Sequence, residues 1–541
     1  MSSICVQLQW GGGKTKGMKV RSLRVWFAFF VMPVLTLATL GCGSGSGYQN
    51  PQSSIIATQN PLVGQYNVGL PHKDSSAWVE FGLDTTYGRQ TSTTTATTDF
   101  GETAAILVAG MLPNTTYHMR AHVDWYGGGT WVDQDQTFTT GPLPGQGLAS
   151  PTFTNPFPPG LTVTRPTPGL SPQPGVEAID VIAPANAPLL GAFVTDIDGH
   201  IIWYYYPGAG HTIVPWKPLP NGNVGLIDSS AAGSQLVEID LAGNIIRQLT
   251  TATLNQQLAA KGYSISIANF HHEILPLANG HWIVLANTTK PYTNLPGYPG
   301  VTEVLGDFVI DLDPNWNPVW VWSSFDHLDI NRHPYEFPDW THSNALVYLP
   351  DGNLLLSSRH QSWLLKLDYE NGSGTGDILW HLGYQGDFTL TQGDPTQWFF
   401  AQHFPSLVAS NGSQLTLAVM DNGDTRIVDG GPAICNPYYD PNPCYSRATI
   451  FDIDQDAKTA NLVWHSDPAG VYSYWGGSIF QLENKDVEFD MTDPFNAPSS
   501  QVMEIAPGAS QQIVWQLDIT GGNAYRAYRI PSLYPGVSWQ Q

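Results

Sequence analysis

The sequence predicts an all-β protein in which a small β-sandwich precedes a six-bladed β-propeller. Three observations predict this fold class. Only 12% of the residues are charged, while Gly (54) and Pro (42) are abundant, a profile of short strands and turns. Two kinds of hairpin alternate along the second part of the chain. At 541 residues, the chain is also too long for one ordinary compact core.

The repeat consists of two hairpin types. The first has an acidic turn and a following strand that usually ends in Trp, with six copies beginning near Asp196, Asp240, Asp311, Asp368, Asp452 and Glu504. The second is marked by two-residue turns, which are strong hairpin signals, at Asn221-Gly222, Asn279-Gly280, Asp351-Gly352, Asn411-Gly412 and, weakly, Glu483-Asn484.

Two hairpins in each of six units give six four-stranded blades. The missing sixth inner hairpin is completed if the two ends of the repeat region pair. A parallel β-helix is the alternative, but its period of about 20–25 residues is shorter than the roughly 45–85 residues between copies here.

The N-terminus, residues 1–42, reads as an export signal. A basic segment precedes an apolar run from Trp26 to Leu40, which is short for a membrane span. Leu40-Gly41-Cys42 resembles a lipoprotein cleavage site, so lipidation of Cys42 and simple cleavage are both open. We expect the protein in the periplasm or cell envelope, free or held to the membrane by a lipid anchor.

Three further segments follow the leader. Residues 54–141 alternate in the manner of a β-sandwich, and Leu112 to Val123 resembles the corner and strand of fibronectin type III domains. Residues 142–176 hold ten prolines and read as a linker or as an extended segment wrapping the next domain. The propeller is assigned to residues 177–541.

Net charge and cysteine content limit the partners. A net charge of −23 argues against nucleic-acid binding, although a local cationic pocket remains compatible with it. Cys435 and Cys444 lie in a Pro/Tyr-rich loop, and in an oxidising compartment we expect them to form a disulfide.

Polar residues converge on one rim of the predicted channel. His272, His342 and His403 stand seven, nine and eight residues before the first residue of successive inner turns, at Asn279, Asp351 and Asn411. The returning strands bring further polar groups to the same rim, namely Asn287, Arg359, Asp421 and Asn422. His271 competes with His272 for the inward position, and the spacing favours His272.

The chemistry of this cluster favours an oxyanion. Carboxylates are sparse, so glycoside hydrolysis by an opposed acid pair fits poorly. Three histidines can hold a metal, but Arg359 in the same cluster counts against one, and no metal or cofactor is predicted. Arg, His and Asn donors suit a tetrahedral oxyanion, and imidazole is a competent nucleophile towards such a centre.

Several phrases, in order and at matching intervals, resemble the bacterial arylsulfate sulfotransferases. They are Trp340-Thr341-His342-Ser343-Asn344, Ser357 to Ser362, Gln402-His403, Asp421-Asn422-Gly423-Asp424-x-Arg426, Tyr445-Ser446-Arg447 and Gly476-Gly477-Ser478. The resemblance implies a periplasmic six-bladed propeller enzyme that moves a sulfuryl group between phenols without a nucleotide donor.

The resemblance also implies residue roles. His403 is the nucleophile that becomes sulfated, so transfer is ping-pong, and the sulfuryl oxygens are held by His272, His342, Asn344 and Arg359. We expect further substrate contacts from His271, His360, Asp421 and Asn422. Trp340 and Trp398 to Phe400 either stack on the aryl ring or pack in the core.

Departures and rivals remain. The segment after the catalytic histidine is Phe404-Pro405-Ser406, where the family usually has Thr-Ala-Trp. The family's disulfide precedes that histidine, whereas the present cysteine pair follows it. The alternatives are a non-catalytic, envelope-tethered binding propeller and a metal-dependent hydrolase or lyase on the same scaffold.

Overall fold

The computed structural model describes residues 51–125, 128–144, 160–182, 191–208, 210–428, 431–432, 444–466, 472–493, 499–508 and 510–540. Within these ranges no helix is long and apolar enough to cross a membrane. The expected leader with Cys42 lies outside the described residues, as does Cys435 of the expected disulfide.

Residues 53–139 form two antiparallel sheets with a shared apolar core. Burial alternates along the strands: Tyr66 and Val68 point inwards from one sheet, and Val79 and Phe81 from the other. This period of two is what packs two sheets face to face. The strands are β1 Ser53–Ala57, β2 Gly64–Leu70, β3 Ser76–Gly82, β4 Arg89–Gln90, β5 Thr94–Thr95, β6 Glu102–Val108, β7 Thr116–Trp125, β8 Gly129–Val132 and β9 Gln136–Thr139. The fibronectin type III likeness stays a prediction.

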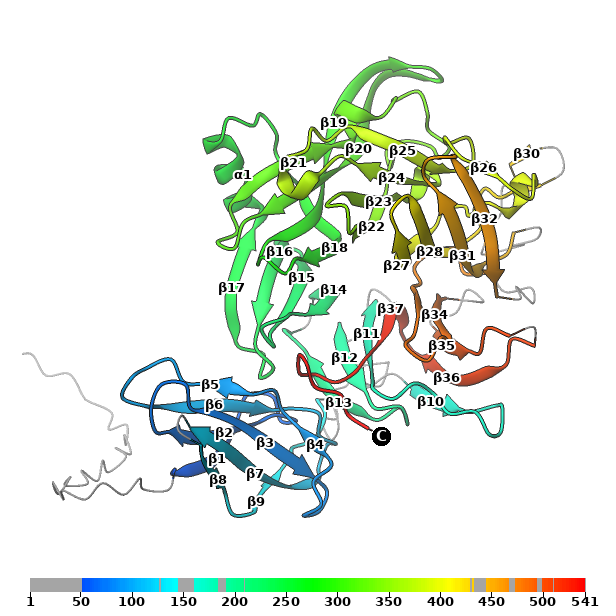
Figure 1. Ribbon diagram of the computed structural model, residues 1–541. Helices are drawn as coiled ribbons and strands as arrows, with labels where there is room; N and C mark the ends of the chain where they lie inside the picture. The colour runs from blue at the N-terminus through cyan, green and yellow to red at the C-terminus, as the bar shows by residue number, and fades with distance from the viewer. Residues whose placement is uncertain are drawn as a thin grey trace, which may run out of the picture. The chain divides into compact units, whose positions relative to one another are not determined.

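Six antiparallel sheets follow, and Figure 1 shows them as blades around a common centre. The predicted six-bladed propeller is therefore confirmed. The blades are, in order, blade one with β11 Val176–Ile182, β12 Ala192–Thr195, β13 Ile201–Tyr205 and β37 Asn523–Ile530; blade two with β14 Thr212–Pro218, β15 Val224–Ser230, β16 Gly233–Ile239 and β17 Ile245–Thr250; blade three with β18 Asn269–Pro276, β19 Trp282–Leu295, β20 Tyr298–Leu312 and β21 Pro318–Ser323; blade four with β22 Ser343–Tyr348, β23 Leu354–Ser358, β24 Trp363–Leu367 and β25 Ile378–Gly383; blade five with β27 His403–Asn411, β28 Gln414–Asp421, β31 Arg447–Asp454 and β32 Thr459–His465; and blade six with β33 Ile479–Gln481, β34 Val487–Thr492, β35 Ser499–Ile505 and β36 Ile513–Thr520.

Smaller elements decorate the blades. The parallel strand β26 Thr389–Leu390 extends blade five, and β29 Ile427–Val428 pairs with β30 Gly431–Pro432. The helices are α1 Thr251–Ala260 and α2 Ser324–His327, with the 3₁₀ turns η1 Arg359–Gln361, η2 Glu370–Gly372 and η3 Pro395–Gln397.

The C-terminal strand closes the ring. β37 pairs antiparallel with β11, so the last strand becomes the innermost strand of blade one. This is the pairing of the two ends of the repeat region that the missing inner hairpin predicted. Because β37 follows β36 of blade six along the chain, its pairing with β11 ties the last blade to the first and covers the exposed edge of β11.

Of the two readings of residues 142–176, the structure agrees with an extended segment that wraps the next domain. Within residues 142–176, β10 Gly160–Thr164 pairs with β36 at the outer edge of blade six. The prolines flank this Leu-Thr-Val-Thr stretch rather than interrupt it, so each backbone N–H can join the ladder. The propeller fold therefore recruits chain from before residue 177.

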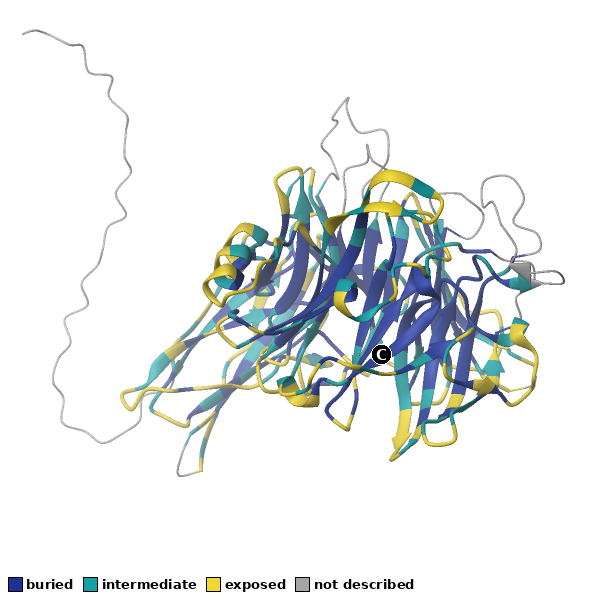
Figure 2. Cartoon of the chain, turned by 90° about the horizontal axis from the view of Figure 1, so that it is seen from above, coloured by how far each residue is buried: buried dark blue, intermediate teal, exposed yellow. Residues whose placement is uncertain are grey.

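In blades two to six the first strand lies innermost, and consecutive inner strands β14, β18, β22 and β27 contact one another. The turns that define this register behave as predicted, with Gly222 and Gly352 at φ of 85° and 84°, conformations open to glycine. Apolar clusters fill the space between neighbouring blades. In Figure 2 the buried residues follow the strands and the exposed ones follow the turns.

Candidate functional site

The inner strands of blades three, four and five each carry a bulge near a predicted site residue. Strand pairing shifts within 270–274 of β18, 343–345 of β22 and 403–406 of β27. His272 and His342 have positive φ, at 55° and 45°. A bulge re-aims side chains, and such strained backbone gathers at functional sites. The unequal spacing of the three histidines from their turns has its origin here.

His272 faces the centre and His271 faces away from it. The His272 ring lies 5.0 Å from that of His342 and 5.7 Å from that of Tyr525 on β37, measured between centroids. His271 directs Nε2 to Asp307 Oδ1 at 3.3 Å and keeps Nδ1 2.8 Å from Nδ1 of His272. The inward position of His272 agrees with the expectation from the spacing, and His271 supports it through the contact between the two Nδ1 atoms. The expected substrate contact of His271 stays a prediction.

His403 is held as a neutral imidazole with a defined tautomer. The amide of Asn422 donates through Nδ2 to the backbone oxygens of Ser473 and Gly476, which leaves its Oδ1 to accept from His403 Nδ1 at 2.7 Å. The N–H of Gly476 donates to His403 Nε2 at 3.2 Å, so Nε2 carries the lone pair. Burial, and next the charge of Arg359, lower the pKa of His403 well below its ordinary value.

Arg359 is anchored through three of its N–H groups. Nη2 donates to Asp424 Oδ2 at 2.6 Å and to the backbone oxygen of Tyr474 at 2.7 Å. Nη1 donates to His360 Nε2 at 2.6 Å. The Nε–H is buried and has no partner among the described atoms. A buried N–H without a partner is costly, so an anion within its reach would be stabilised.

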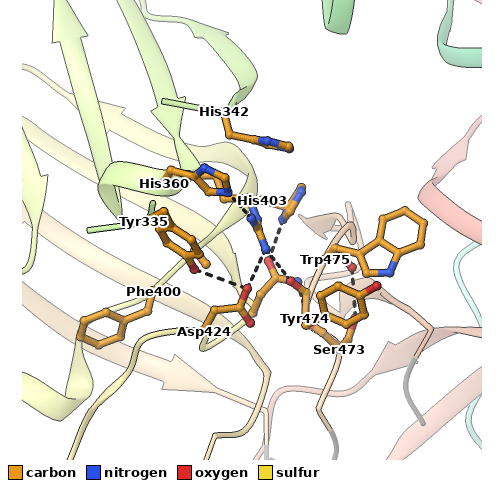
Figure 3. A network of polar contacts seen from close by, with 12 residues as sticks. Tyr335, His342, His360, Phe400, His403, Asp424, Ser473, Tyr474 and Trp475 are labelled. Carbon is orange, nitrogen blue, oxygen red and sulfur yellow. Dashed lines mark hydrogen bonds and ion pairs between the residues drawn. The ribbon is translucent and has the colours of Figure 1, made fainter. Parts of the chain in front are cut away.

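Figure 3 shows His403 between the side chains of Tyr335, His342 and His360 and those of Tyr474 and Trp475. The side chain of His342 is 29% exposed, and that of Asp339, which accepts from His342 Nδ1 at 2.5 Å, is 33% exposed. Solvent therefore reaches the cluster from the side of His342, while His403 is 2% exposed.

Asp339, His342 and His360 are close enough together for one metal ion. Because Arg359 can only donate, His360 Nε2 must accept from it, and Nδ1–H must donate to the backbone oxygen of Asp339 at 2.7 Å. Both nitrogens of His360 are thus engaged, and its pKa is lowered to about 3 by burial and then by Arg359. The arrangement disfavours the metal-dependent alternative.

His360 stacks on Tyr335, with centroids 4.1 Å apart, and so stands between Arg359 and the loop that precedes β22. Its Nε2 accepts from Arg359, and its ring lies 4.6 Å from that of His342 between centroids. His360 therefore orients Arg359, and its expected contact with substrate stays a prediction.

Asn344 and the inner backbone are tied together by Arg526 of β37. Arg526 Nη2 donates to the backbone oxygens of His272 at 2.8 Å and Asn344 at 2.6 Å, and Nη1 lies 3.2 Å from Glu273 Oε2. The Nδ2 of Asn344 donates to the backbone oxygen of Gln402, which leaves one N–H for a substrate, while its Oδ1 has no partner among the described atoms.

Asp421 and Asn422 serve inside the protein. Asp421 accepts from the backbone N–H of Phe400 and pairs with Arg426 at 2.7 Å and Arg447 at 3.0 Å, so an internal ion cluster, not a substrate, satisfies it. Asn422 sets the orientation of His403, as described above. The internal partners thus give Asp421 a structural role and Asn422 a positioning role, while their expected substrate contacts stay predictions.

The aromatic alternatives resolve in favour of packing. Trp340 is 1% exposed and donates to the backbone of Arg332. Trp398, Phe399 and Phe400 belong to the apolar cluster between blades four and five. These side chains stabilise the scaffold around the site.

Sequence reasoning missed five groups that complete the site: Asp424, Tyr474, Gly476, Tyr525 and Arg526. Asp424 and Gly476 belong to two of the sequence phrases that resemble the arylsulfate sulfotransferases. Those phrases mark the two residues as part of the resemblance but do not indicate what either residue does. Tyr474 acts through its backbone oxygen, which no residue type can announce. Tyr525 and Arg526 lie on β37. No turn motif next to this strand indicates which of its residues reach the rim of the channel.

Comparison with known proteins adds a family. The profile of the arylsulfotransferase (ASST) family matches residues 185–529, more than half of the chain. No curated protein matches the chain. Solved structures with similarity include a protein of unknown function from Bacteroides caccae (11% identity, 66% of this chain and 98% of that one, TM-score 0.38) and a member of the DUF4221 family from Bacteroides vulgatus (8%, 69% and 97%, 0.33). Streptogramin B lyase is similar at 10% identity over 66% of this chain and 98% of that one, with a TM-score of 0.27. These scores carry no argument about fold or function.

Proposed function

The chain belongs to the arylsulfotransferase family, and on that premise we propose that it moves a sulfuryl group from an aryl sulfate to a phenol through a sulfohistidine at His403. Family membership supports aryl sulfate and phenol substrates. The covalent, two-step course of the reaction is our proposal.

One observation carries it. His403 offers a lone pair on Nε2, fixed by the amide of Asn422 and the N–H of Gly476, in a cluster where Arg359 has an unpartnered donor. A neutral imidazole is the nucleophilic form, and fixed donors are most effective where charge develops in a buried site.

The first half-reaction forms a nitrogen–sulfur bond. The lone pair of His403 Nε2 attacks sulfur while the bond from sulfur to the aryl oxygen breaks, and the aryl oxygen leaves with the electron pair as a phenolate. The ring becomes cationic, and its Nδ1–H still donates to Asn422 Oδ1. The long 3.2 Å contact from Gly476 N–H to Nε2 must yield as sulfur approaches.

The second half-reaction reverses the roles. The acceptor phenol loses its proton to solvent, which also protonates the phenolate released in the first half. The acceptor oxygen then attacks sulfur, the nitrogen–sulfur bond breaks, and the electron pair returns to Nε2. In both halves the transition state is expected to be loose, with charge on the peripheral and bridging oxygens, as in phosphoryl transfer. We assign Arg359, His342, His272 and the free N–H of Asn344 to those oxygens.

The experiment traps the intermediate. The full chain is incubated with 4-nitrophenyl sulfate without acceptor, digested near neutral pH, and the peptide carrying His403 is examined by mass spectrometry. We expect a sulfuryl adduct that disappears when a phenol is added, with release of the new aryl sulfate. Turnover without an adduct, or full turnover by His403→Ala, would refute the proposal. Neither turnover nor adduct would favour the non-catalytic binding propeller.

We also propose that the chain acts in the periplasm or cell envelope, with Cys42 lipidated or the leader cleaved and with Cys435 bonded to Cys444. The basic and apolar composition of residues 14–40 supports export. Fractionation of cells that make the full chain, followed by intact mass of the mature protein, tests all three parts. Unprocessed protein in the cytoplasm with free thiols would contradict them.

A further inference from the structure

Asp424 lies directly behind the guanidinium of Arg359. Its Oδ2 accepts from Arg359 Nη2 at 2.6 Å and lies 3.5 Å from the hydroxyl of Tyr335. Its Oδ1 accepts from the hydroxyl of Tyr472 at 2.5 Å. The carboxyl side chain is 12% exposed and that of Arg359 is 9% exposed, so the pair is shielded from solvent. An ion pair in such surroundings is weakly screened and strongly felt by any further charge nearby.

Counting the donors of Arg359 shows what the pair leaves for a ligand. The two N–H groups of Nη2 go to Asp424 and to the Tyr474 backbone, and one N–H of Nη1 goes to His360. The Nε–H and one N–H of Nη1 remain. The guanidinium is thus held in one orientation, and its positive charge is largely offset by a carboxylate on its anchored side.

We propose that Asp424 is a positioning and specificity-determining residue, a counter-charge that sets the site to bind monoanionic sulfuryl esters and to reject dianions such as inorganic sulfate and aryl phosphates. This inference rests on the proposed function. An uncompensated Arg359 would bind a dianion about twice as strongly, in Coulombic terms, as a monoanion at the same place, since the energy scales with ligand charge. A carboxylate behind it repels both in the same ratio and so penalises the dianion more.

The same device protects turnover. An aryl sulfate carries one negative charge, and Arg359 faces its peripheral oxygens before and during transfer. Tighter binding that is equal in the ground state and the transition state lowers KM without raising kcat. A dianion trapped beside His403 would simply block the site. The carboxylate of Asp424 offsets part of the positive charge of Arg359 and keeps the guanidinium in place. A dianion is therefore held less tightly beside His403.

The charge state of Asp424 fits this role near neutral pH. Burial raises its pKa to about 6, opposed by the charge of Arg359 and by the hydroxyl of Tyr472, with smaller effects of Asp421 and Tyr335. The carboxyl group is therefore ionised at pH 7.5 and becomes neutral as the pH falls below about 6. Dianion binding by the native chain should then strengthen through that window.

The test compares Asp424→Asn with the native full chain at pH 7.5. Asparagine keeps an acceptor oxygen for Arg359 but removes the charge. Calorimetric titration with inorganic sulfate should show about tenfold tighter binding in the variant, and KM for 4-nitrophenyl sulfate should fall by less, about threefold, as expected from the charge ratio. Sulfate affinity that is unchanged or weaker overturns the inference. A merely structural role for Asp424 predicts a raised KM instead.

Two more variants keep the experiment decisive. Asp311→Asn is the matched control, because Asp311 is also a buried carboxylate that accepts from a tyrosine, Tyr369, at 2.7 Å, and its other partner is His281. It should leave sulfate affinity unchanged. Tyr472→Phe removes a hydrogen bond that lowers the pKa of Asp424 and leaves the ion pair with Arg359. The strengthening of sulfate binding at falling pH should therefore begin at a higher pH in this variant than in the native chain, and an unshifted pH dependence would overturn the inference even if Asp424→Asn failed to fold.

The outcomes separate the two proposals. If the native chain forms no adduct at His403, the proposed function fails. If the native chain transfers sulfuryl groups but Asp424→Asn discriminates between sulfate and aryl sulfate as before, only the counter-charge fails.

Discussion

The Oδ1 atom of Asn422 lies 2.7 Å from Nδ1 of His403, and both N–H groups of the same amide are used by backbone oxygens of the segment 473–476. The amide cannot turn over without losing two hydrogen bonds. Asn422 therefore fixes the tautomer in which His403 Nε2 is nucleophilic, much as a triad carboxylate or amide orients its histidine.

Replacing Asn422 should separate orientation from charge. Asn422→Ala should lower kcat/KM by about two orders of magnitude, because an unheld imidazole loses tautomer and direction. Asn422→Asp should retain transfer but raise the pKa of His403, because a carboxylate stabilises the imidazolium. Steady-state rates across pH report both effects. Asn223→Ala, which removes an amide that donates to Glu238 in blade two, should leave the rates unchanged.

Arg359 should not be replaceable by lysine. Arg359→Ala is expected to cost about two or more orders of magnitude in kcat, the scale of losing one oxyanion donor. Arg359→Lys should recover little of this loss, because a single ammonium cannot reach His360, Asp424, the Tyr474 backbone and the substrate together. Single-turnover rates with 4-nitrophenyl sulfate measure the step. Rates for the lysine variant within about threefold of the native rate would contradict the fork geometry.

The rate of sulfuryl transfer at saturating donor should not fall near pH 6.5. Burial and Arg359 depress the pKa of His403, so the nucleophile stays neutral well below the ordinary histidine range. The depressed pKa also affects stability, because below about pH 6.5 the unfolded chain binds a proton at His403 that the folded chain does not bind. The contribution of neutral His403 to the free energy of unfolding is therefore present above about pH 6.5 and is lost as the pH falls. Pre-steady-state bursts between pH 7.5 and 5.5 test the rate. An acid limb centred near pH 6.5 in the native chain would count against a depressed pKa of His403.

The sequence could predict the six-bladed ring and the residues at one rim of its channel, but not the directions in which their side chains point. The Gly turns and the acidic turns mark both ends of each hairpin, so the six blades and the convergence of His272, His342 and His403 follow from register alone. The bulges in β18, β22 and β27 do not, because they arise where tertiary contacts overrule regular pairing. Register alone therefore does not distinguish His271 from His272 as the residue that faces the centre.

Arg526 illustrates a second limit. It joins the backbones of His272 and Asn344 across the centre of the ring, and its position depends on β37 closing blade one. Nothing local in Asn523–Ile530 indicates which blade it enters. The pairing of the two ends of the repeat region could be predicted, because one inner hairpin was missing. The sequence could not show that this pairing brings the side chain of Arg526 to the centre of the ring.

Gly476 should tolerate no side chain. Its φ is 67°, and a Cβ atom would lie 2.4 Å from Thr492 Oγ1, on the segment that donates to His403 and binds Asn422. Gly412 has a similar φ of 62°, but its Cβ would meet nothing within 4 Å. Both alanine variants should lose about 1 kcal/mol of stability through strain at positive φ. Only Gly476→Ala should also lose transfer activity, because it displaces the backbone that holds the nucleophile. Equal activity in the two variants would argue that the segment plays no part in the site.

Ring closure should depend on a buried arginine in the closing strand. Arg529 of β37 contacts Glu177 of blade one at 2.7 Å and, in blade six, Glu488 at 3.2 Å and Glu504 at 3.3 Å, with every one of these side chains 1% exposed or less. Arg529→Leu would leave three buried carboxylates without their counter-ion and should cost about 3–5 kcal/mol in the free energy of unfolding. The exposed pair of Arg165 and Asp198 provides the control, since Arg165→Leu should cost less than about 1 kcal/mol.

Urea denaturation at pH 7.5 measures this difference. Burial raises the pKa of Glu177 and of Glu488, so these carboxyl groups take up protons readily once Arg529 is gone. The penalty of Arg529→Leu should therefore shrink as the pH is lowered from 7.5 towards 5, while that of Arg165→Leu should stay small throughout. A loss that is equal for the two variants, or independent of pH, would show that the blades are joined by backbone pairing of β37 and β11 without help from this cluster.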